Sequence, residues 1–268
     1  MSYWGMRLTE HEQLREALAH ISYPAGIISC GGALRREGIP IPFDGYCAIG
    51  GRSFFPGGKG HVSDRLPTRG IMYLGQDFGK YSDFVSAVRR GREDDTSATW
   101  RGINEGVVNH LDEGVIWFTN YYMGIRDGGS SVGSLKDFVK EKYSTDSWDS
   151  VGEKCWNSYE EFCWEFFKLQ VSLQRPKVVV ALGRQVIDSL GAHLPQMLPE
   201  WRIRKSSTFG HLRGIAHQVE FETQGKPPRI KVIAAYHPMY FSGDPRKLAK
   251  IEDDAQFVRD QFGNPNTA

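Results

Sequence analysis

Residues 70–79 read GIMYLGQDFG, in which the short apolar run Gly70–Leu74 is followed, after Gly75, by the polar residues Gln76 and Asp77. Comparable apolar runs recur three times further along the chain, at 114–119, 177–182 and 230–236. Stretches with helical spacing separate these runs, and this alternation is typical of a parallel sheet with helices on both faces. We therefore predict an α/β fold, a three-layer α/β/α sandwich around a central, mainly parallel four-stranded sheet.

The expected helices are recognised by apolar residues at three- and four-residue spacing. They cover 8–20, 81–90, 98–111, 132–142, 150–173, 184–191 and 245–262. Between the first helix and the first strand the chain is rich in Gly and Pro, which favours loops. We expect a single domain over residues 1–268, in which residues 1–69 form a loop-rich N-terminal elaboration.

The composition is that of an ordinary globular protein, with 40% hydrophobic, 12% aromatic and 24% charged residues. The first residues lack a basic stretch followed by an apolar core, and no apolar run approaches the roughly 20 residues that span a bilayer. We therefore expect a cytoplasmic protein without a membrane partner, and nothing in the sequence indicates an obligate protein partner.

The net charge of +1 excludes a histone-like binder that neutralises many phosphates, but it allows a local basic face. Three small basic clusters are candidates for contact with phosphate groups, although such clusters are also common on ordinary solvated surfaces. They are Arg89-Arg90-Arg92, Arg202-Arg204-Lys205 and Arg246-Lys247-Lys250.

The four cysteines, Cys30, Cys47, Cys155 and Cys163, include no C-x-x-C pair of the kind that zinc and iron–sulfur sites commonly use. We expect four reduced thiols, no metal and no cofactor. A four-thiolate site is the alternative, because Cys155 and Cys163 lie eight residues apart in an expected helix and could share a face.

Polar side chains follow the ends of three of the four expected strands. Asp77 follows the first strand, Asn120 the second and His237 the fourth, whereas the third ends in Gly183-Arg184. Ligands of open parallel sheets bind just beyond the carboxyl ends of the strands. The sequence therefore predicts that Asp77, Asn120 and His237 share one site.

Four short motifs at these strand ends, taken in order, resemble those of the uracil-DNA glycosylase superfamily over roughly residues 70–245. Gly75-Gln76-Asp77 resembles the family's Gly-Gln-Asp-Pro-Tyr, and Phe118-Thr119-Asn120 resembles its Leu-Leu-Asn. The apolar run ending in Leu182-Gly183 resembles its third strand, and His237-Pro238-Met239-Tyr240-Phe241 resembles its His-Pro-Ser-Pro-Leu loop. The resemblance implies the family's fold, with DNA as the partner, and hydrolysis of the bond between a DNA sugar and a pyrimidine.

The resemblance also implies roles for three residues. Breaking an N-glycosidic bond leaves positive charge on the sugar and negative charge on the departing base. By resemblance, Asp77 orients a water and stabilises the sugar, and a neutral His237 donates a hydrogen bond to O2 of the leaving pyrimidine. The amide of Asn120 reads the edge of the extruded base, because it supplies both a donor and an acceptor.

Other residues near these motifs are expected to contact the base. Gln76, Phe78 and Gly79 belong to the first motif and line the expected base pocket. Phe78 and Trp100 are candidates for stacking on the extruded base. Trp100 has a purely structural alternative, because most tryptophans are largely buried in the core.

The loop after the fourth strand is expected to meet the DNA. Met239, Tyr240 and Phe241 supply apolar side chains that can fill the gap left by an extruded base, and Phe241 aligns with the family's wedge leucine. Arg246 is a candidate phosphate contact. The alternative for the three loop residues is that they pack beneath the closing helix.

Gly79 departs from the family pattern, since uracil-specific relatives carry there a tyrosine that blocks the 5-position of the base. An open pocket at this point would admit a 5-substituted or otherwise modified pyrimidine, because discrimination against extra volume requires atoms that clash. The alternative is that Gly79 is a turn residue with positive φ. A modified base would suit DNA repair or defence against modified viral DNA, and no residue decides between these roles.

Structural explanations also exist for the three central residues: Asp77 could cap the next helix, Asn120 could close a turn, and His237 could be a buried histidine before a proline. Two other functional classes stay open beside a DNA glycosylase. One is an N-ribosyl hydrolase acting on free nucleosides or nucleotides, and the other is a catalytically silent relative that binds nucleic acid.

Overall fold

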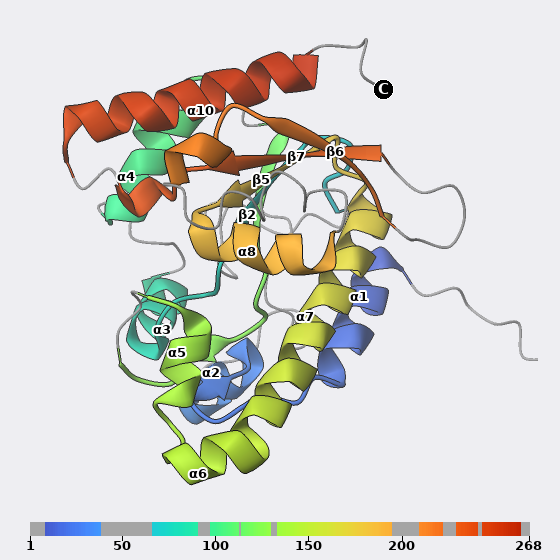
Figure 1. The fold of residues 1–268 in the computed structure, drawn as a ribbon, viewed down its shortest axis with the longest axis vertical. Coiled ribbons are helices and arrows are strands. Elements are labelled where there is room, and N and C mark those ends of the chain that lie inside the picture. Colours follow the sequence, from blue (N-terminus) through green and yellow to red (C-terminus); the bar gives the residue numbers. More distant parts are fainter. Residues whose placement is uncertain are drawn as a thin grey trace, which may run out of the picture.

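The computed structural model describes residues 9–38, 66–90, 97–112, 114–129, 133–194, 209–221, 229–240 and 243–263. At its centre lies a five-stranded sheet with the strand order β3-β2-β5-β7-β6 (Figure 1). Four of these strands run parallel, and β6 pairs antiparallel with β7 at one edge. The strands are β2 (Ile71–Gly75), β3 (Ile116–Asn120), β5 (Val178–Leu182), β6 (Ala216–Glu220) and β7 (Arg229–Ala235).

The four parallel strands confirm the strands expected from the apolar runs, and all residues of β2, β3 and β5 are buried. The expectation of a four-stranded sheet is wrong, because β6 adds a fifth strand. In β6 only Val219 is buried, and its neighbours Gln218 and Glu220 are exposed. An edge strand with one buried residue leaves no apolar run in the sequence, so the pattern gave no sign of it.

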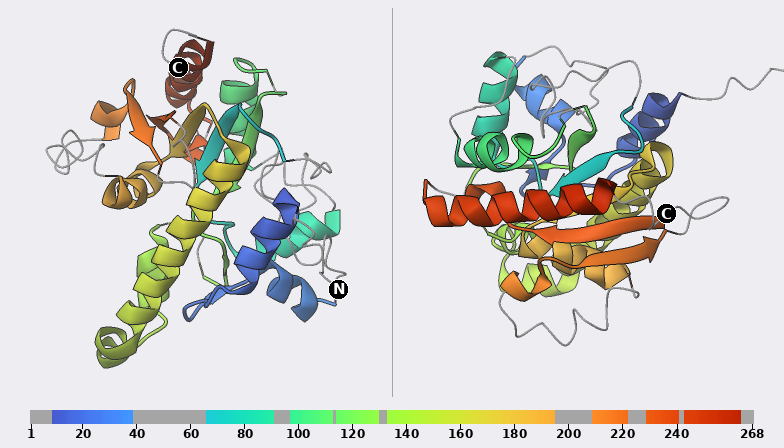
Figure 2. Two further views of the ribbon diagram at one scale, coloured as in Figure 1. Left: turned by 90° about the vertical axis from the view of Figure 1, so that its right-hand side faces the viewer. Right: turned by 90° about the horizontal axis from the view of Figure 1, so that it is seen from above.

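Helices cover both faces of the sheet. On one face, β2 residues Met72 and Leu74 join a core cluster with side chains from α1 (Glu10–Ala19), α7 (Glu153–Gln174) and α8 (Arg184–His193). On the other face, Ile71 and Tyr73 join side chains of α4 (Ala98–Ile103), η2 (Asn104–Val108) and α10 (Pro245–Gly263). Figures 1 and 2 show this three-layer arrangement, with α10 lying over the sheet in the view from above.

Further helices are α2 (Cys30–Arg36), α3 (Tyr81–Arg90), α5 (Leu135–Lys140), α6 (Thr145–Ser147), η3 (Trp148–Gly152) and η5 (Phe209–Leu212). The helix expected over 98–111 is present in two parts, because α4 gives way to a π-helical turn, η2, at Asn104. Within the part of the chain that the structure describes, no helix combines the length and the apolar character needed to cross a bilayer.

The described part of the N-terminal elaboration, residues 9–38 and 66–69, contains more regular structure than the Gly and Pro content of the segment indicates. Besides α1 it contains α2 and the short strand β1 (Ile27–Ile28), which pairs antiparallel with β4 (Ile125–Arg126). Cys30, the first residue of α2, is disulfide-bonded, and its partner lies outside the described residues. The expectation of four reduced thiols is therefore wrong, as is the alternative of a four-thiolate site, whereas Cys155 and Cys163 are free.

A close approach joins α4 to the turn η6 (Pro238–Tyr240), which directly follows His237. Gly102 makes this contact possible, because a Cβ atom at position 102 would lie 2.5 Å from the carbonyl oxygen of Pro238. Two atoms so placed must move apart. Because Gly102 has no side chain, the loop that carries His237 lies close to α4.

We expect Gly102→Ala to lower the free energy of unfolding by about 1–2 kcal/mol, because overpacking against Pro238 outweighs the better helix propensity of Ala. Urea denaturation measures the change. Gly263→Ala is the matched control, since a Cβ atom there meets nothing within 4 Å and Gly263 also lies in a helix. A Gly102→Ala variant as stable as the wild type would contradict the close-packing argument.

Candidate functional site

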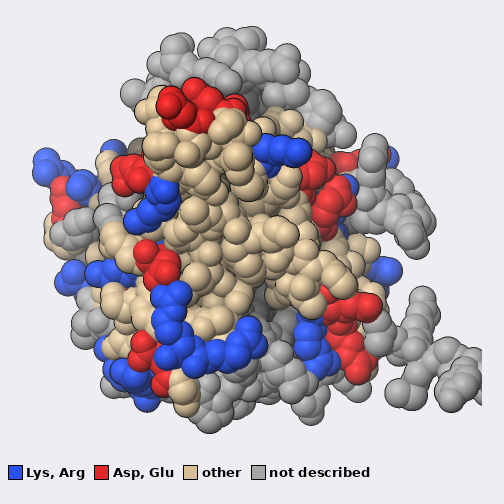
Figure 3. All heavy atoms as spheres, turned by 90° about the horizontal axis from the view of Figure 1, so that it is seen from below, with Lys and Arg blue, Asp and Glu red and all other residues tan. Residues whose placement is uncertain are grey.

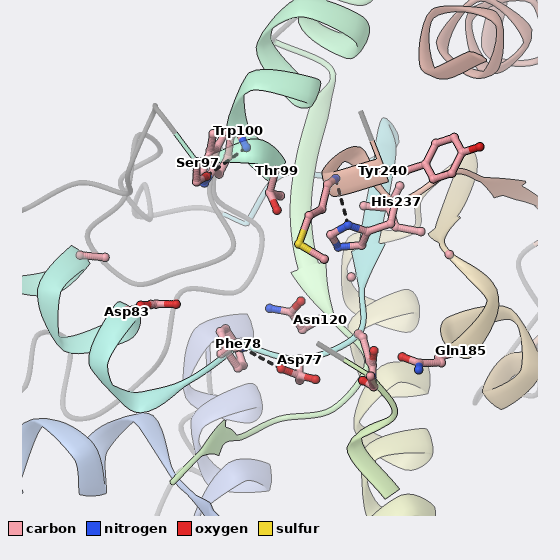
Figure 4. Close-up of a pocket in the computed structure, with 18 of the residues that line it drawn as sticks. Asp77, Phe78, Asp83, Ser97, Thr99, Trp100, Asn120, Gln185, His237 and Tyr240 are labelled. Carbon is pink, nitrogen blue, oxygen red and sulfur yellow. Dashed lines mark hydrogen bonds between the residues drawn. The ribbon is translucent and has the colours of Figure 1, made fainter. Parts of the chain in front are cut away.

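A cavity of about 700 Å³ opens beyond the carboxyl ends of the four parallel strands. Its lining includes Asp77, Asn120 and His237, which the sequence analysis expected to share one site. Figure 4 shows these three side chains around one space, with Trp100 and Thr99 on one side and Phe78 and Asp83 on another. The structure thus brings together residues that lie as much as 160 positions apart in the sequence (237 − 77 = 160).

The carboxylate of Asp77 is held on both oxygens. Oδ1 accepts a hydrogen bond of 2.7 Å from the backbone N–H of Gly79, and Oδ2 accepts one of 2.7 Å from Nη2 of Arg126. Asp77 therefore closes the turn ahead of α3, and these bonds are not those of a cap on α3. A carboxylate offers about four acceptor positions, so two are left for a water or a ligand.

Arg126 is the central residue that the sequence analysis missed. Its side chain is 1% exposed and that of Asp77 is 5% exposed, so their ion pair is buried. Nη2 of Arg126 also donates to the carbonyl oxygen of Gly133 at 2.9 Å, and the guanidinium lies 5.6 Å from the ring centre of Phe138. The sole sign in the sequence is one arginine in the otherwise uncharged stretch 118–126.

His237 lies just after β7 and lines the cavity, and a hydrogen bond fixes which nitrogen of its imidazole carries the proton. Its Nδ1 accepts a hydrogen bond of 3.2 Å from the backbone N–H of Met239. Nδ1 must therefore be unprotonated, and the proton of the neutral ring sits on Nε2 as a donor. Burial lowers the pKa of His237 from 6.5 to about 4, so the neutral form is present at pH 7.

A buried carboxylate on α10 positions the end of β7. Asp254 accepts a hydrogen bond of 2.8 Å from the backbone N–H of Tyr236, the residue before His237. It also accepts one of 2.6 Å from Nε of Arg213. Burial raises the pKa of Asp254 to about 6 despite these partners. Asp254 and Arg213 were not singled out from the sequence, because neither lies next to a motif.

Asn120 is the last residue of β3 and stands in register with Gly75 at the end of the neighbouring strand β2. Its side chain is only 2% exposed and lines the cavity. Gln76 lines it too, and its Nε2 donates to the carbonyl oxygen of Gly133 at 3.4 Å. Both side chains therefore line the cavity, and their role as base-binding residues stays a prediction.

The aromatic residues Phe78 and Trp100 each belong to the hydrophobic core and also form part of the cavity wall. Phe78 is 2% exposed and Trp100 is 6% exposed, and both line the cavity. The ring of Trp100 packs edge-on against Phe118, with 5.6 Å between ring centres. The core alternative for Trp100 is therefore correct in part, and it does not exclude contact with a ligand.

Gly79 has a φ of 73°, a conformation that residues with a Cβ atom rarely adopt. The alternative that Gly79 is a turn residue is therefore confirmed. Gly79 also lines the cavity, where it contributes only backbone to the wall. A substitution at this position changes the turn and the pocket together, and other positions offer a cleaner test of pocket size.

The rim of the cavity carries two exposed apolar side chains, Met239 at 39% and Tyr240 at 37% exposure. Tyr240 stacks on Tyr236 with 4.5 Å between ring centres, and Nζ of Lys247 lies 4.9 Å from the Tyr240 ring centre. Met239 is therefore not packed beneath the closing helix, whereas the ring of Tyr240 contacts Lys247 of α10, so the packing alternative is correct in part for Tyr240. Phe241, the residue aligned with the family's wedge, lies outside the described residues.

Basic residues near the rim have mixed placements. The side chain of Arg246 is 91% exposed and lies 3.4 Å from a carboxylate oxygen of Asp244, and Arg89 pairs with Glu37 at 2.6 Å. Arg92 and the cluster 202–205 lie outside the described residues. On the face seen from below, Lys and Arg are interspersed with Asp and Glu, so that view shows no uniform basic surface (Figure 3).

Neither the known protein-family models nor the curated proteins give a match to this chain. Among the described residues, no three His, Cys, Asp or Glu side chains gather as they would around a metal ion. The chemistry of the site is therefore argued from its own geometry.

We expect the ring signals of His237 to titrate with a midpoint of about pH 4, because burial opposes protonation. Unfolded chains bind that proton near pH 6.5, so this residue makes folding less favourable as pH falls from 6.5 to 4. NMR titration of the imidazole measures the midpoint, and His237→Gln identifies the signal by its loss. A midpoint near 6.5 would contradict the desolvation of this partly buried imidazole.

Proposed function

We propose that this chain is a DNA glycosylase, similar to the uracil-DNA glycosylases, that hydrolyses the N-glycosidic bond of an extruded pyrimidine. The main support is that Asp77, Asn120 and His237, from three separate strand ends, line one cavity with the Nε2–H of a neutral His237 as a donor. The family resemblance predicts this combination of side chains. The product would be a DNA strand with an abasic site and a free base.

The arrangement suits the charges that develop as the bond breaks. The electron pair of the N–C bond passes to the base, and the Nε2–H of His237 would stabilise the resulting anion at O2. Because the pKa of its protonated form is about 4, the imidazole is neutral and has no second proton to transfer, so its Nε2–H acts as a hydrogen-bond donor. The unused acceptor positions of Asp77 would orient a water toward the sugar carbon.

The ion pair with Arg126 supports a competing, structural explanation of Asp77. In that case the carboxylate would only neutralise a buried guanidinium, and the cavity would belong to a binding protein without catalytic activity. Removing one member of a buried pair leaves an uncompensated charge, whereas replacing both members often costs little. Under both explanations, replacing Asp77 and Arg126 together should restore stability. Only if Asp77 is purely structural should the same double replacement also restore activity.

Asp77→Asn should reduce base release at least ~100-fold and destabilise the fold by about 3–5 kcal/mol, because it removes a charge from both the reaction and the ion pair. The double variant Asp77→Asn with Arg126→Gln should recover most of the stability but not the activity. Urea denaturation and alkaline cleavage of labelled oligonucleotides measure the two effects. Recovery of turnover in the double variant would show that Asp77 is structural.

The exposed rim supports DNA as the partner in preference to a free nucleoside, because Met239 and Tyr240 line the cavity and also present apolar surface to its outside, at 39% and 37% exposure. Apolar side chains beside a base pocket can enter the stack that an extruded base leaves. The same residues would matter little on single strands, where few stacked pairs must be opened.

We expect Tyr240→Ala to slow base release from duplex DNA roughly ten-fold and from single strands much less, because only the duplex must be unstacked. Single-turnover assays on one labelled strand, alone and annealed, measure both rates. Val151→Ala is the control, since Val151 is another exposed apolar residue and lies on η3. Equal losses on the two substrates would remove Tyr240 from the DNA interface.

A further inference from the structure

The cavity is larger than the site formed by Asp77, Asn120 and His237. It continues between α3 and α4, where its lining comprises Asp83, Ser86, Ala87, Arg90, Ser97 and Thr99. Figure 4 shows Asp83 extending from α3 toward the space beneath Ser97 and Thr99. At about 700 Å³ the whole cavity lies within the range that holds drug-sized ligands, and a single pyrimidine ring fills a fraction of that volume.

Gly79 lies at the junction between the two parts, because it follows Asp77 in the chain and precedes α3. Both Asp77 and Gly79 line the cavity, and the backbone of Gly79 is held by bonds to Asp77 and Arg126. With no side chain at Gly79, nothing from this residue separates the central site from the extension. A group attached to the base could therefore reach from one part into the other.

The extension is polar and carries both signs of charge. Ser86, Ser97 and Thr99 contribute hydroxyl groups, Asp83 a carboxylate and Arg90 a guanidinium. The Asp83 carboxylate lies 3.6 Å from Nζ of Lys80, and the hydroxyl of Ser97 accepts from the backbone N–H of Trp100 at 3.2 Å. Such a lining offers donors and acceptors together, which suits neutral hydroxyl groups better than a methyl group, a phosphate or an amine.

We infer that the base released by this protein carries a neutral, hydroxyl-bearing substituent at its 5-position, up to the size of one sugar ring. The inference rests on the proposed glycosylase function and assigns the extension as the subsite for that substituent. Asp83, Ser86 and Thr99 are its specificity-determining residues. The substituent passes Gly79 and forms hydrogen bonds with side chains of α3 and of the first turn of α4.

The test compares duplexes that each contain one uracil, thymine, 5-hydroxymethylcytosine or glucosylated 5-hydroxymethylcytosine. The wild-type protein should release a hydroxyl-bearing base at least ~10-fold faster than uracil or thymine, a difference within reach of a few hydrogen bonds. Faster release of uracil or thymine would overturn the inference and leave the proposed function standing. Absence of abasic sites from every duplex, single-stranded forms included, would overturn both.

Two variants locate the subsite. Ser86→Phe fills the extension and should slow release of the hydroxyl-bearing base at least ~10-fold more than release of uracil, which ends the preference. Ser82→Phe is the matched control, because Ser82 lies in the same helix, is exposed and is not among the residues that line the cavity. Asp83→Asn, at a side chain 55% exposed, is a milder change that should reduce the preference several-fold without affecting the fold. An unchanged preference in both variants would overturn the assignment.

Discussion

The buried ion pair between Asp77 and Arg126 is the contact on which the geometry of the site depends. Two opposite charges removed from water are costly unless they pair with each other and gain further hydrogen bonds. Here the backbone N–H of Gly79 donates to Asp77, and Gly133 and Phe138 contact the guanidinium of Arg126. Since Arg126 belongs to β4, which pairs with β1, the pair also couples the end of the parallel sheet to the N-terminal elaboration.

Much of the fold follows from patterns within short windows of sequence. The run Val178–Leu182 is buried on both sides in the structure, and it was recognisable because a central parallel strand is apolar without alternation. The strand ends could be predicted from the same runs, and with them the cluster of Asp77, Asn120 and His237, because topology brings parallel strand ends to one edge.

What could not be predicted are features that depend on distant partners. Arg126 is 49 residues from Asp77, and Asp254 is 41 residues from Arg213. Neither pairing has a local signature, since a charged residue in a loop or a helix is ordinarily solvated. The extension of the cavity likewise depends on distant residues, because α3 and α4 line it from two sides. The conformation of Gly79 was open to two explanations until its φ was known, because glycine tolerates either sign.

The hydrogen bond from Tyr236 to Asp254 has a consequence for the order in which the molecule is assembled. A chain made from its N-terminus exposes Asp77 and Asn120 long before residue 254 has left the ribosome. Until α10 arrives, the backbone before His237 lacks its acceptor, and a buried N–H without a partner is costly. The imidazole therefore reaches its final position late in synthesis, and a nascent chain that already holds the central sheet would still lack a finished pocket.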